Sequence, residues 1–344
     1  MAAPPEVTIT DQVTRLYEII AGYHSTQMLE IGRELGIWEY LTTEGSASVE
    51  KISAALGLDS FYTDVLCRTA FSAGVLERDG EGWRMAPHMD LLLGSPGAAF
   101  DLARVARVHM LLGNDYRQYA DAFRNGSTLS YQAHDRAFME EVALALRSLP
   151  SMFVEAVLPQ LPEVQTKLGD ANRILDVGCG GGWAVVKLAE TYPNAAVVGI
   201  DIEPVSVQLA DKLVHERGLT DRCEIILGDA SSFASGERFD VATLFLVYHE
   251  IEPELKRTVL ESVFQALAPG GMLVLFDEVY PEAEDELRVM PTRFSALAQW
   301  YELIWGNVIG TRSDVLDDCR STGFTVTKEL PFSRFHIVVC ERPQ

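Results

Sequence analysis

The spacing of apolar residues divides the chain into two parts. From residue 11 to about residue 165, apolar side chains such as Leu16, Ile19, Ile20 and Tyr23 recur at intervals of three and four residues, as on one face of a helix. Beyond residue 165, short runs rich in Val and Ile alternate with helical segments. This alternation is typical of a mostly parallel sheet covered by helices. We therefore predict an α/β protein with a mainly helical first part.

The first part carries the signals of a compact helical unit with one hairpin. Its first helical stretch stops at Gly36, and a second, short amphipathic helix ends at Gly57. Asp59 or Ser60 caps a further helix, and two short strands follow with their turn around Asp79 and Gly80. Helix, turn, helix and hairpin in this order predict a winged-helix unit.

The charge of this unit argues against nucleic acid as its partner. Between Glu50 and Asp90 there are four basic and seven acidic residues, and the whole chain has a formal net charge of -22. Phosphate groups would be repelled, because nucleic-acid binding normally requires a basic surface. We expect the unit to mediate dimerisation or to cover a substrate.

The second part predicts seven strands that follow a linker at residues 162–172. The predicted strands cover residues 173–178, 195–201, 223–229, 241–247, 272–278, 324–330 and 335–341. The chain shows no basic segment followed by an apolar stretch at its start, and no apolar run of about 20 residues. Its five cysteines are far apart, without a CxxC pair. We expect a cytoplasmic protein with no membrane partner, zinc site or disulfide framework.

A glycine-rich turn after the first of these strands is the main chemical signal. The strand ends at Asp176, glycines stand at 178, 180, 181 and 182, and a helix begins near Trp183. Glycines let a ligand approach the backbone, and the helix N-terminus offers free N–H groups. The next strand ends in Asp201, where a carboxylate can bind two ribose hydroxyls. This pattern suits NAD and S-adenosylmethionine (SAM) alike.

The detailed spacing separates these two ligands. A dinucleotide fingerprint that starts at Gly178 requires glycine at position 183, where this chain has Trp183. The run Asp176-x-Gly178-x-Gly180-x-Gly182 instead resembles motif I of the class I SAM-dependent methyltransferases. The resemblance implies a Rossmann-like, seven-stranded catalytic domain, here residues 166–344, with SAM as cofactor.

The same resemblance assigns residues to the cofactor. It places Asp176 near the amino group of SAM and Asp229 at the adenine amino group, and VFQALAPGGMLVLFDEVY resembles the family's helix, Pro-Gly-Gly turn and fifth strand. The predicted SAM-binding residues are Asp176, Gly178, Gly180, Gly182, Trp183, Asp201, Ile202, Asp229, Ala230 and Phe245.

With its helical first part, the chain looks like the small-molecule O-methyltransferases. In that family a His-Asp pair follows the fourth strand, and its histidine removes the acceptor's hydroxyl proton; His249 and Glu250 occupy these positions here and are the predicted catalytic residues. The resemblance implies a winged-helix-like dimerisation domain at residues 1–105 and a helical linker at residues 106–165 that lines the acceptor pocket. The predicted pocket residues are Tyr116, Tyr131, Phe138, Met139, Tyr248, Tyr280, Arg293, Trp300 and Tyr301.

Four hypotheses about function follow, and the residues alone do not decide between them. The first is methyl transfer to a heteroatom of a small metabolite, with His249 as base if that atom is oxygen. The second is S-methylation of a thioether acid without a base, as in the bacterial methylthiohydroxybutyrate S-methyltransferases of dimethylsulfoniopropionate synthesis, which share this layout. The third is metal-assisted C-methylation of a keto acid, because related enzymes place a metal on the histidine of this loop, here His249, although no metal site is expected. The fourth is a SAM-sensing winged-helix regulator. The resembling family also implies a homodimer through the N-terminal domain.

Overall fold

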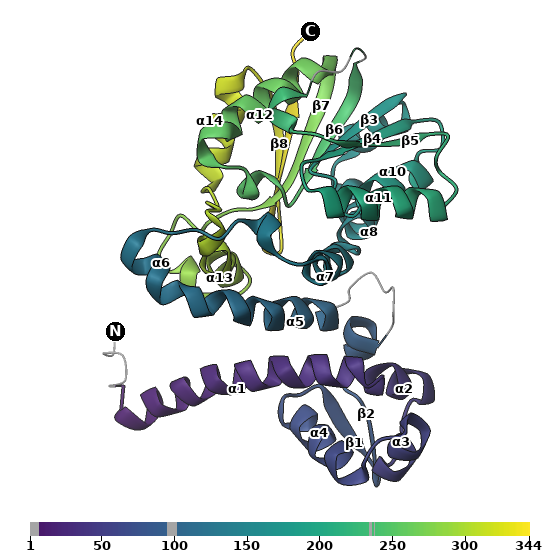
Figure 1. Cartoon of the computed structure of the whole chain (residues 1–344), viewed down its shortest axis with the longest axis vertical. Helices are drawn as coiled ribbons and strands as arrows, with labels where there is room; N and C mark the ends of the chain where they lie inside the picture. The colour runs from purple at the N-terminus through teal and green to yellow at the C-terminus, as the bar shows by residue number, and fades with distance from the viewer. Residues whose placement is uncertain (1–6, 95–101, 234–235, 237) are drawn as a thin grey trace. The chain divides into compact units, whose positions relative to one another are not determined.

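The computed structural model describes residues 7–94, 102–233, 236 and 238–344, and the chain forms two compact units (Figure 1). The first unit is Met1–Gly113 and the second is Asn114–Gln344. The predicted linker at residues 106–165 is therefore divided, and most of it belongs to the second unit.

The first unit contains the helices and the hairpin in the order that the sequence predicts. Gly36 and Gly57 adopt the left-handed conformation, with φ of 73° and 69°, and each one separates two helices. The Asp59 side chain caps the following helix by accepting from the backbone N–H of Phe61 and Tyr62. The elements are α1 (Ile9–Glu34), α2 (Ile37–Glu44), α3 (Val49–Leu56), α4 (Ser60–Ser72), β1 (Leu76–Asp79), β2 (Gly82–Met85), the π-helix η1 (Asp90–Gly94) and α5 (Leu102–Leu111).

Two tryptophans form the centre of this unit's core. Trp38 and Trp83 are both 1 % exposed, and the Trp38 ring lies directly over Gly32, where any side chain would collide with it. The Trp38 indole N–H donates to the Leu29 carbonyl at 2.8 Å, so the ring is buried with its polar group satisfied. This contact holds α2 against the C-terminal part of α1.

The second unit is built on the seven-stranded sheet that the sequence predicts, and the α/β fold class is confirmed. The strands lie in the order β5-β4-β3-β6-β7-β9-β8, and β9 runs antiparallel to both of its neighbours. The strands are β3 (Arg173–Val177), β4 (Ala196–Asp201), β5 (Cys223–Leu227), β6 (Phe239–Phe245), β7 (Leu267–Glu278), β8 (Thr325–Phe332) and β9 (Phe335–Glu341).

Helices cover both faces of this sheet (Figure 1). One face, with Ile174 and Val241, packs on α9 and α10, and the other, with Leu175 and Ala242, packs on α12 and α14. Neighbouring residues of β3 thus enter opposite cores, as strand geometry requires. The helices are α6 (Tyr119–Asn125), α7 (Arg136–Leu146), α8 (Leu149–Met152), α9 (Pro162–Gly169), α10 (Trp183–Thr191), α11 (Pro204–Glu216), α12 (Pro253–Ala266), α13 (Thr292–Glu302) and α14 (Arg312–Thr322).

The prediction of a linker at residues 162–172 is wrong over most of that range, because α9 occupies it. Pro162 stands in the first turn, where its missing N–H costs nothing. Val164 and Leu168, one helical turn apart, are both buried in the core beneath the sheet. The polar residues between them had suggested a loop.

The segment Arg136–Gln160 is long and apolar enough to cross a membrane by length and composition. Only a third of its most apolar window is buried within the chain. In the fold it is divided into α7, α8, the π-helix η4 (Phe153–Val157) and the short 3-10 helix η5 (Leu158–Gln160). Residues Met139, Val142, Leu146 and Leu149 on this segment face a cavity, and Phe153 enters the core. A ligand site and the core account for its apolar character.

Gly182 sets the distance between α10 and α11. A Cβ atom there would lie 2.8 Å from the Cβ of Ala210 and 2.9 Å from its Cα. We predict that Gly182→Ala lowers the free energy of unfolding by about 1–3 kcal/mol more than Gly218→Ala does. Gly218 is a matched control, because it also has a positive φ but open space around it. Equal decreases in the free energy of unfolding of the two variants, measured by urea unfolding, would contradict this prediction.

Candidate functional site

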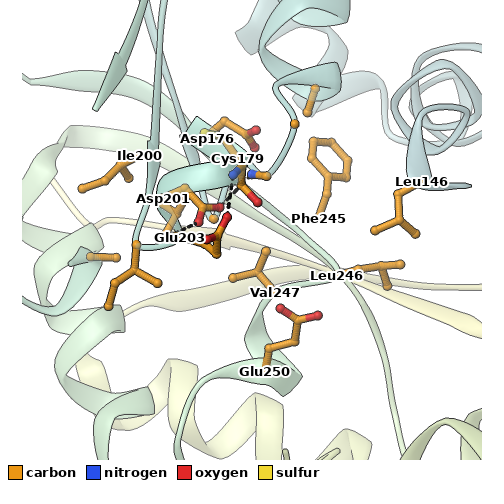
Figure 2. A pocket seen from close by; sticks show the side chains of 18 of the residues that line it. Leu146, Asp176, Cys179, Ile200, Asp201, Glu203, Phe245, Leu246, Val247 and Glu250 are labelled. Atoms are coloured by element: carbon orange, nitrogen blue, oxygen red, sulfur yellow. Dashed lines mark hydrogen bonds between the residues drawn. The ribbon is translucent and has the colours of Figure 1, made fainter. Parts of the chain in front are cut away.

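A cavity of about 330 Å³ opens at the carboxyl ends of the parallel strands (Figure 2). Its floor is formed by the ends of β3, β4 and β6 and by the loops that follow them. The apolar wall comes from the segment Met139–Pro150. Ligands of open α/β sheets bind at this edge, and the volume lies in the range of small-molecule sites.

The glycine turn after β3 forms one side of the cavity. Gly180 has a φ of 50°, and a Cβ atom built on it would meet nothing within 4 Å, so its backbone is open to a ligand. Gly178 also has a positive φ, but a Cβ there would lie 2.5 Å from the side chain of Val247. The two glycines therefore serve different purposes: one admits a ligand and the other admits the loop after β6.

Asp201, at the end of β4, is held by the glycine turn. Its Oδ2 accepts from the Gly180 N–H at 2.7 Å, and its Oδ1 accepts from the Glu203 N–H at 2.8 Å. Figure 2 shows Asp176, Asp201 and Glu203 grouped around Cys179. Burial raises the pKa of Asp201, although these backbone hydrogen bonds oppose the shift. The carboxylate is thus fixed in orientation before any ligand binds.

Asp176 lies deeper, at the end of β3. It is 1 % exposed, and its Oδ1 accepts from the Thr243 hydroxyl at 2.7 Å. Burial raises the pKa of this carboxyl to about 7, against the effect of the hydrogen bond. A bound cation would favour the ionised form of Asp176.

His249, in the turn η7 (Tyr248–Glu250), is buried between two carboxylates. Its Nδ1 lies 2.5 Å from Asp277 Oδ1, and its Nε2 lies 3.2 Å from Glu302 Oε2. Burial alone would lower the pKa of His249, but the two carboxylates outweigh it and hold the pKa well above the ordinary value. The imidazole does not line the cavity itself. Asn307 does, and its Nδ2 donates to Glu302 at 3.1 Å.

Glu250 points into the cavity, apart from the other carboxylates and beyond Val247 (Figure 2). The residue is exposed, and it lines the cavity. Desolvation there, reinforced by the charges of Glu302 and Asp277, raises the pKa of Glu250 to about 8, while His249 opposes the shift.

The lining of the cavity carries charge of one sign. Its ionisable residues include the carboxylates Asp176, Asp201, Glu203, Glu250 and Glu252, and among the described residues that line it none is Lys, Arg or His. A pyrophosphate would bring two negative charges into this environment with no basic partner. SAM brings an ammonium and a sulfonium group against one carboxylate, so its net charge is positive. The charge of the lining therefore favours SAM over a dinucleotide.

Comparison with known proteins agrees with this electrostatic argument. Residues 174–271 match the family model described as "Methyltransferase domain". The chain is a SAM-dependent methyltransferase with the class I fold. The methyltransferase is 25 % identical over 342 residues to the phenazine O-methyltransferase PhzM of Lysobacter antibioticus, covering 95 % of each chain. These matches support the hypothesis of an enzyme over that of a SAM-sensing regulator.

Two further comparisons describe the wider family. The methyltransferase is 24 % identical over 284 residues to the L-tyrosine C(3)-methyltransferase of Streptomyces lavendulae, covering 78 % of this chain and 75 % of that one. The crystal structure of human N-acetylserotonin methyltransferase in complex with SAM superposes with a TM-score of 0.78 at 17 % identity, covering all of both chains. The latter likeness shows the shared fold.

The structure brings most of the predicted SAM-binding residues to one cavity, and two lie elsewhere. Asp176, Gly178, Gly180, Trp183, Asp201, Ile202, Ala230 and Phe245 line it. Gly182 does not, because its role is to let α10 approach α11. Asp229 is exposed outside the lining, and its Oδ1 accepts from the Ser231 N–H at 2.8 Å to cap the turn η6 (Ala230–Ser232).

Of the predicted acceptor residues, Tyr131 and Met139 line the cavity. Phe138 is buried behind them, stacked on His134 at 4.1 Å between ring centroids. Tyr248 packs on the opposite face of the sheet, where its hydroxyl donates to Asp318 at 2.6 Å.

The other predicted acceptor residues stand outside the lining of the cavity. Tyr116 and Trp300 belong to an aromatic cluster with Tyr119 and Phe123, and Arg293 is exposed. Tyr280 pairs through its backbone with the segment at Thr311, and burial raises the pKa of Tyr301. The family resemblance placed these residues near the site but did not show which way they point.

Sequence reasoning missed Cys179, Glu203, Ser206 and Asn307, all of which line the cavity. Glu203 is 6 % exposed and caps α11 by accepting from the Ser206 N–H at 2.5 Å. Its place two residues after Asp201, before a proline, was the available signal. Desolvation raises the pKa of the Cys179 thiol well above its ordinary value, and the charge of Asp201 adds to this. Asn307 carried no signal in the sequence.

Among the described residues, no group of three or more His, Cys, Asp or Glu side chains is arranged to hold a metal ion. His249, the metal ligand in the C-methylation reading, has carboxylates against both ring nitrogens.

Asp201 tests the assignment of the cofactor half of the cavity. We predict that Asp201→Asn weakens SAM binding by about 1–3 kcal/mol, because a charged acceptor for ligand hydroxyls and for the glycine turn is lost. Isothermal titration calorimetry measures this directly. Asp211→Asn, an exposed change on α11, serves as the control. An affinity equal to that of the control would show that the ribose assignment is wrong.

Proposed function

We propose that this methyltransferase transfers the methyl group of SAM to a hydroxyl oxygen of a small-molecule acceptor. The observation that carries the proposal is the imidazole of His249, buried between two carboxylates beside the cavity. An imidazole held in this way is built to gain a proton, and methylation of a hydroxyl releases one. The phenazine O-methyltransferase, which is similar along nearly the whole chain, acts on oxygen.

SAM supplies an electrophilic methyl group when it is bound. The residues of this chain that would hold it are the backbone of Gly180 and the carboxylates of Asp176 and Asp201. The apolar wall from Met139 to Leu149 excludes water from the acceptor side. Alignment of the two reactants in a dry cavity supplies much of the catalysis of such a transfer.

His249 takes the acceptor's proton at Nε2. Asp277 accepts from Nδ1 and from the backbone N–H of His249, so it fixes the ring and its tautomer. The contact from Nε2 to Glu302 is longer, at 3.2 Å, and lies on the side of the cavity-lining Asn307. An acceptor hydroxyl reaches Nε2 by replacing that contact. Both carboxylates then stabilise the imidazolium that forms.

This geometry favours oxygen over the other two acceptor atoms considered. A thioether carries no proton to remove, so His249 and its two carboxylates would have no catalytic role in S-methylation. C-methylation with a metal would require His249 to release a carboxylate from one ring nitrogen.

The pH dependence of turnover tests the role of His249. The base must be neutral to accept a proton, so the rate rises with pH through its raised pKa. We predict that Glu302→Gln removes a negative charge, lowers the pKa of His249 and moves this limb of the rate profile to lower pH. Glu286→Gln, an exposed change, leaves it in place. We expect His249→Ala to lose about 10²–10⁴-fold in kcat with unchanged SAM affinity. Full turnover by His249→Ala would remove the residue from the mechanism.

We also propose that the protein is a cytoplasmic homodimer joined through the first unit. Within that unit, α1 leaves apolar side chains exposed along most of its length, among them Ile9 at 85 %, Leu16 at 61 % and Tyr23 at 64 %. Exposed apolar surface of this extent marks an interface. A second copy is the occupant that the family resemblance implies. All five cysteines are buried and free, which supports a reducing compartment.

Replacement of apolar residues on α1 tests the dimer. We predict that the double change Leu16→Glu and Ile20→Glu gives a monomer, because the interface would have to bury two charges. Sedimentation velocity measures the change in mass. The control pair, Glu18→Gln and Arg15→Gln, alters polar positions on the same helix and keeps the dimer. A wild-type chain that sediments as a monomer would refute the proposal directly.

A further inference from the structure

The cavity stays acidic away from the strand-end carboxylates Asp176 and Asp201. Glu250 and Glu252 line it from the loop after β6, and Tyr131, Gln132 and Asn307 are among its neutral polar residues. Much of the remaining wall is apolar. An acceptor therefore meets carboxylates, neutral amides and one phenol, with no basic side chain among the described residues that line the cavity.

Three basic residues from neighbouring elements have partners outside the cavity. Arg334 donates to Glu278 at 2.5 Å and packs against the ring of Phe335. The Lys256 ammonium donates to the Val308 carbonyl at 2.8 Å, and Arg136 bonds Glu140 and Gln208. None of these groups lines the cavity, so none is placed to neutralise an anionic acceptor.

Residues of the cavity already respond to this negative potential. Burial raises the pKa of the Tyr131 phenol well above its ordinary value, and the charges of Glu250 and Asp201 raise it further. A bound phenol would experience the same field. Its proton is therefore retained until a base removes it. Asp201, Glu203 and the ionised form of Glu250 would repel a carboxylate substituent on the acceptor, whereas a cationic substituent would favour that ionised form.

We propose that the cavity selects acceptors by charge: it takes a neutral or cationic hydroxyl compound and rejects one that bears a carboxylate or phosphate. Glu250 is the residue that makes this selection, by accepting a hydrogen bond from an N–H or O–H group of the acceptor. The inference rests on the proposed transfer to a hydroxyl and names its substrate class. It also disfavours the thioether acid, whose carboxylate would have no partner.

Three catechols that differ in one substituent test this selection. They are 3,4-dihydroxybenzylamine, 4-methylcatechol and 3,4-dihydroxybenzoate, which carry an ammonium, a methyl and a carboxylate group. Their affinities are measured by calorimetry on the full chain saturated with S-adenosylhomocysteine, so that binding is separated from turnover. We expect the amine to bind at least about 10-fold more tightly than the benzoate, with the methyl compound between them. Equal affinities, or no binding of any of the three, would overturn the proposal.

A matched pair of variants assigns the selection to Glu250. Glu250→Gln keeps the size of the side chain and should reduce the amine-to-benzoate ratio by at least about threefold. Glu254→Gln, an exposed change on α12 outside the cavity, should leave it unchanged. An unaltered ratio in both variants would remove Glu250 from the proposal.

Methyl transfer to the same compounds is followed separately, by release of S-adenosylhomocysteine. The charge order in binding without any transfer would uphold the selection and count against the proposed function. Transfer to all three compounds at equal kcat/KM would count against the selection alone.

Discussion

The convergence of parallel strand ends is the constraint on which this molecule depends. Strands β3 and β4 deliver Asp176 and Asp201 to one edge of the sheet, and the loop after β6 delivers Glu250 to the same edge. Carboxylates gathered in this way lose hydration and repel one another, and the pKa values of all three are raised, chiefly by desolvation. Such a cluster is stable only with a cation or a proton. The sulfonium and ammonium groups of SAM supply the positive charge. The charge that the fold gathers at this edge thus favours a cationic cofactor.

The sequence predicted those parts of the fold that depend on local chemistry. Alternation of β-rich and helical runs sufficed for seven strands, and left-handed glycines at Gly36 and Gly57 ended helices where expected. It failed at α9, because two buried residues one turn apart, Val164 and Leu168, were hidden among polar neighbours. Packing against the sheet stabilises the helical conformation of that segment, and no local sequence pattern predicts this packing.

The candidate site divides in the same way. Residues on the glycine turn and at the strand ends were predictable, since backbone geometry fixes where they point. Aromatic residues on the helices were not, because helical spacing defines a face and does not say what that face meets. Tyr248 shows the difference: it adjoins His249 in sequence, yet its side chain crosses to the opposite core and bonds Asp318. The partners of His249 likewise come from positions 28 and 53 residues further along the chain.

The environment of Cys179 in the cavity prevents a side reaction with the cofactor. A thiolate within the glycine turn would be the strongest nucleophile in the cavity, and it would compete with any acceptor for an activated methyl group. Burial is the main reason that its ionisation is disfavoured, and the charges of Asp201 and Asp176 add to this effect, so the sulfur remains a thiol. Burial and the negative field that attracts the methyl donor thus together protect the enzyme from alkylating itself.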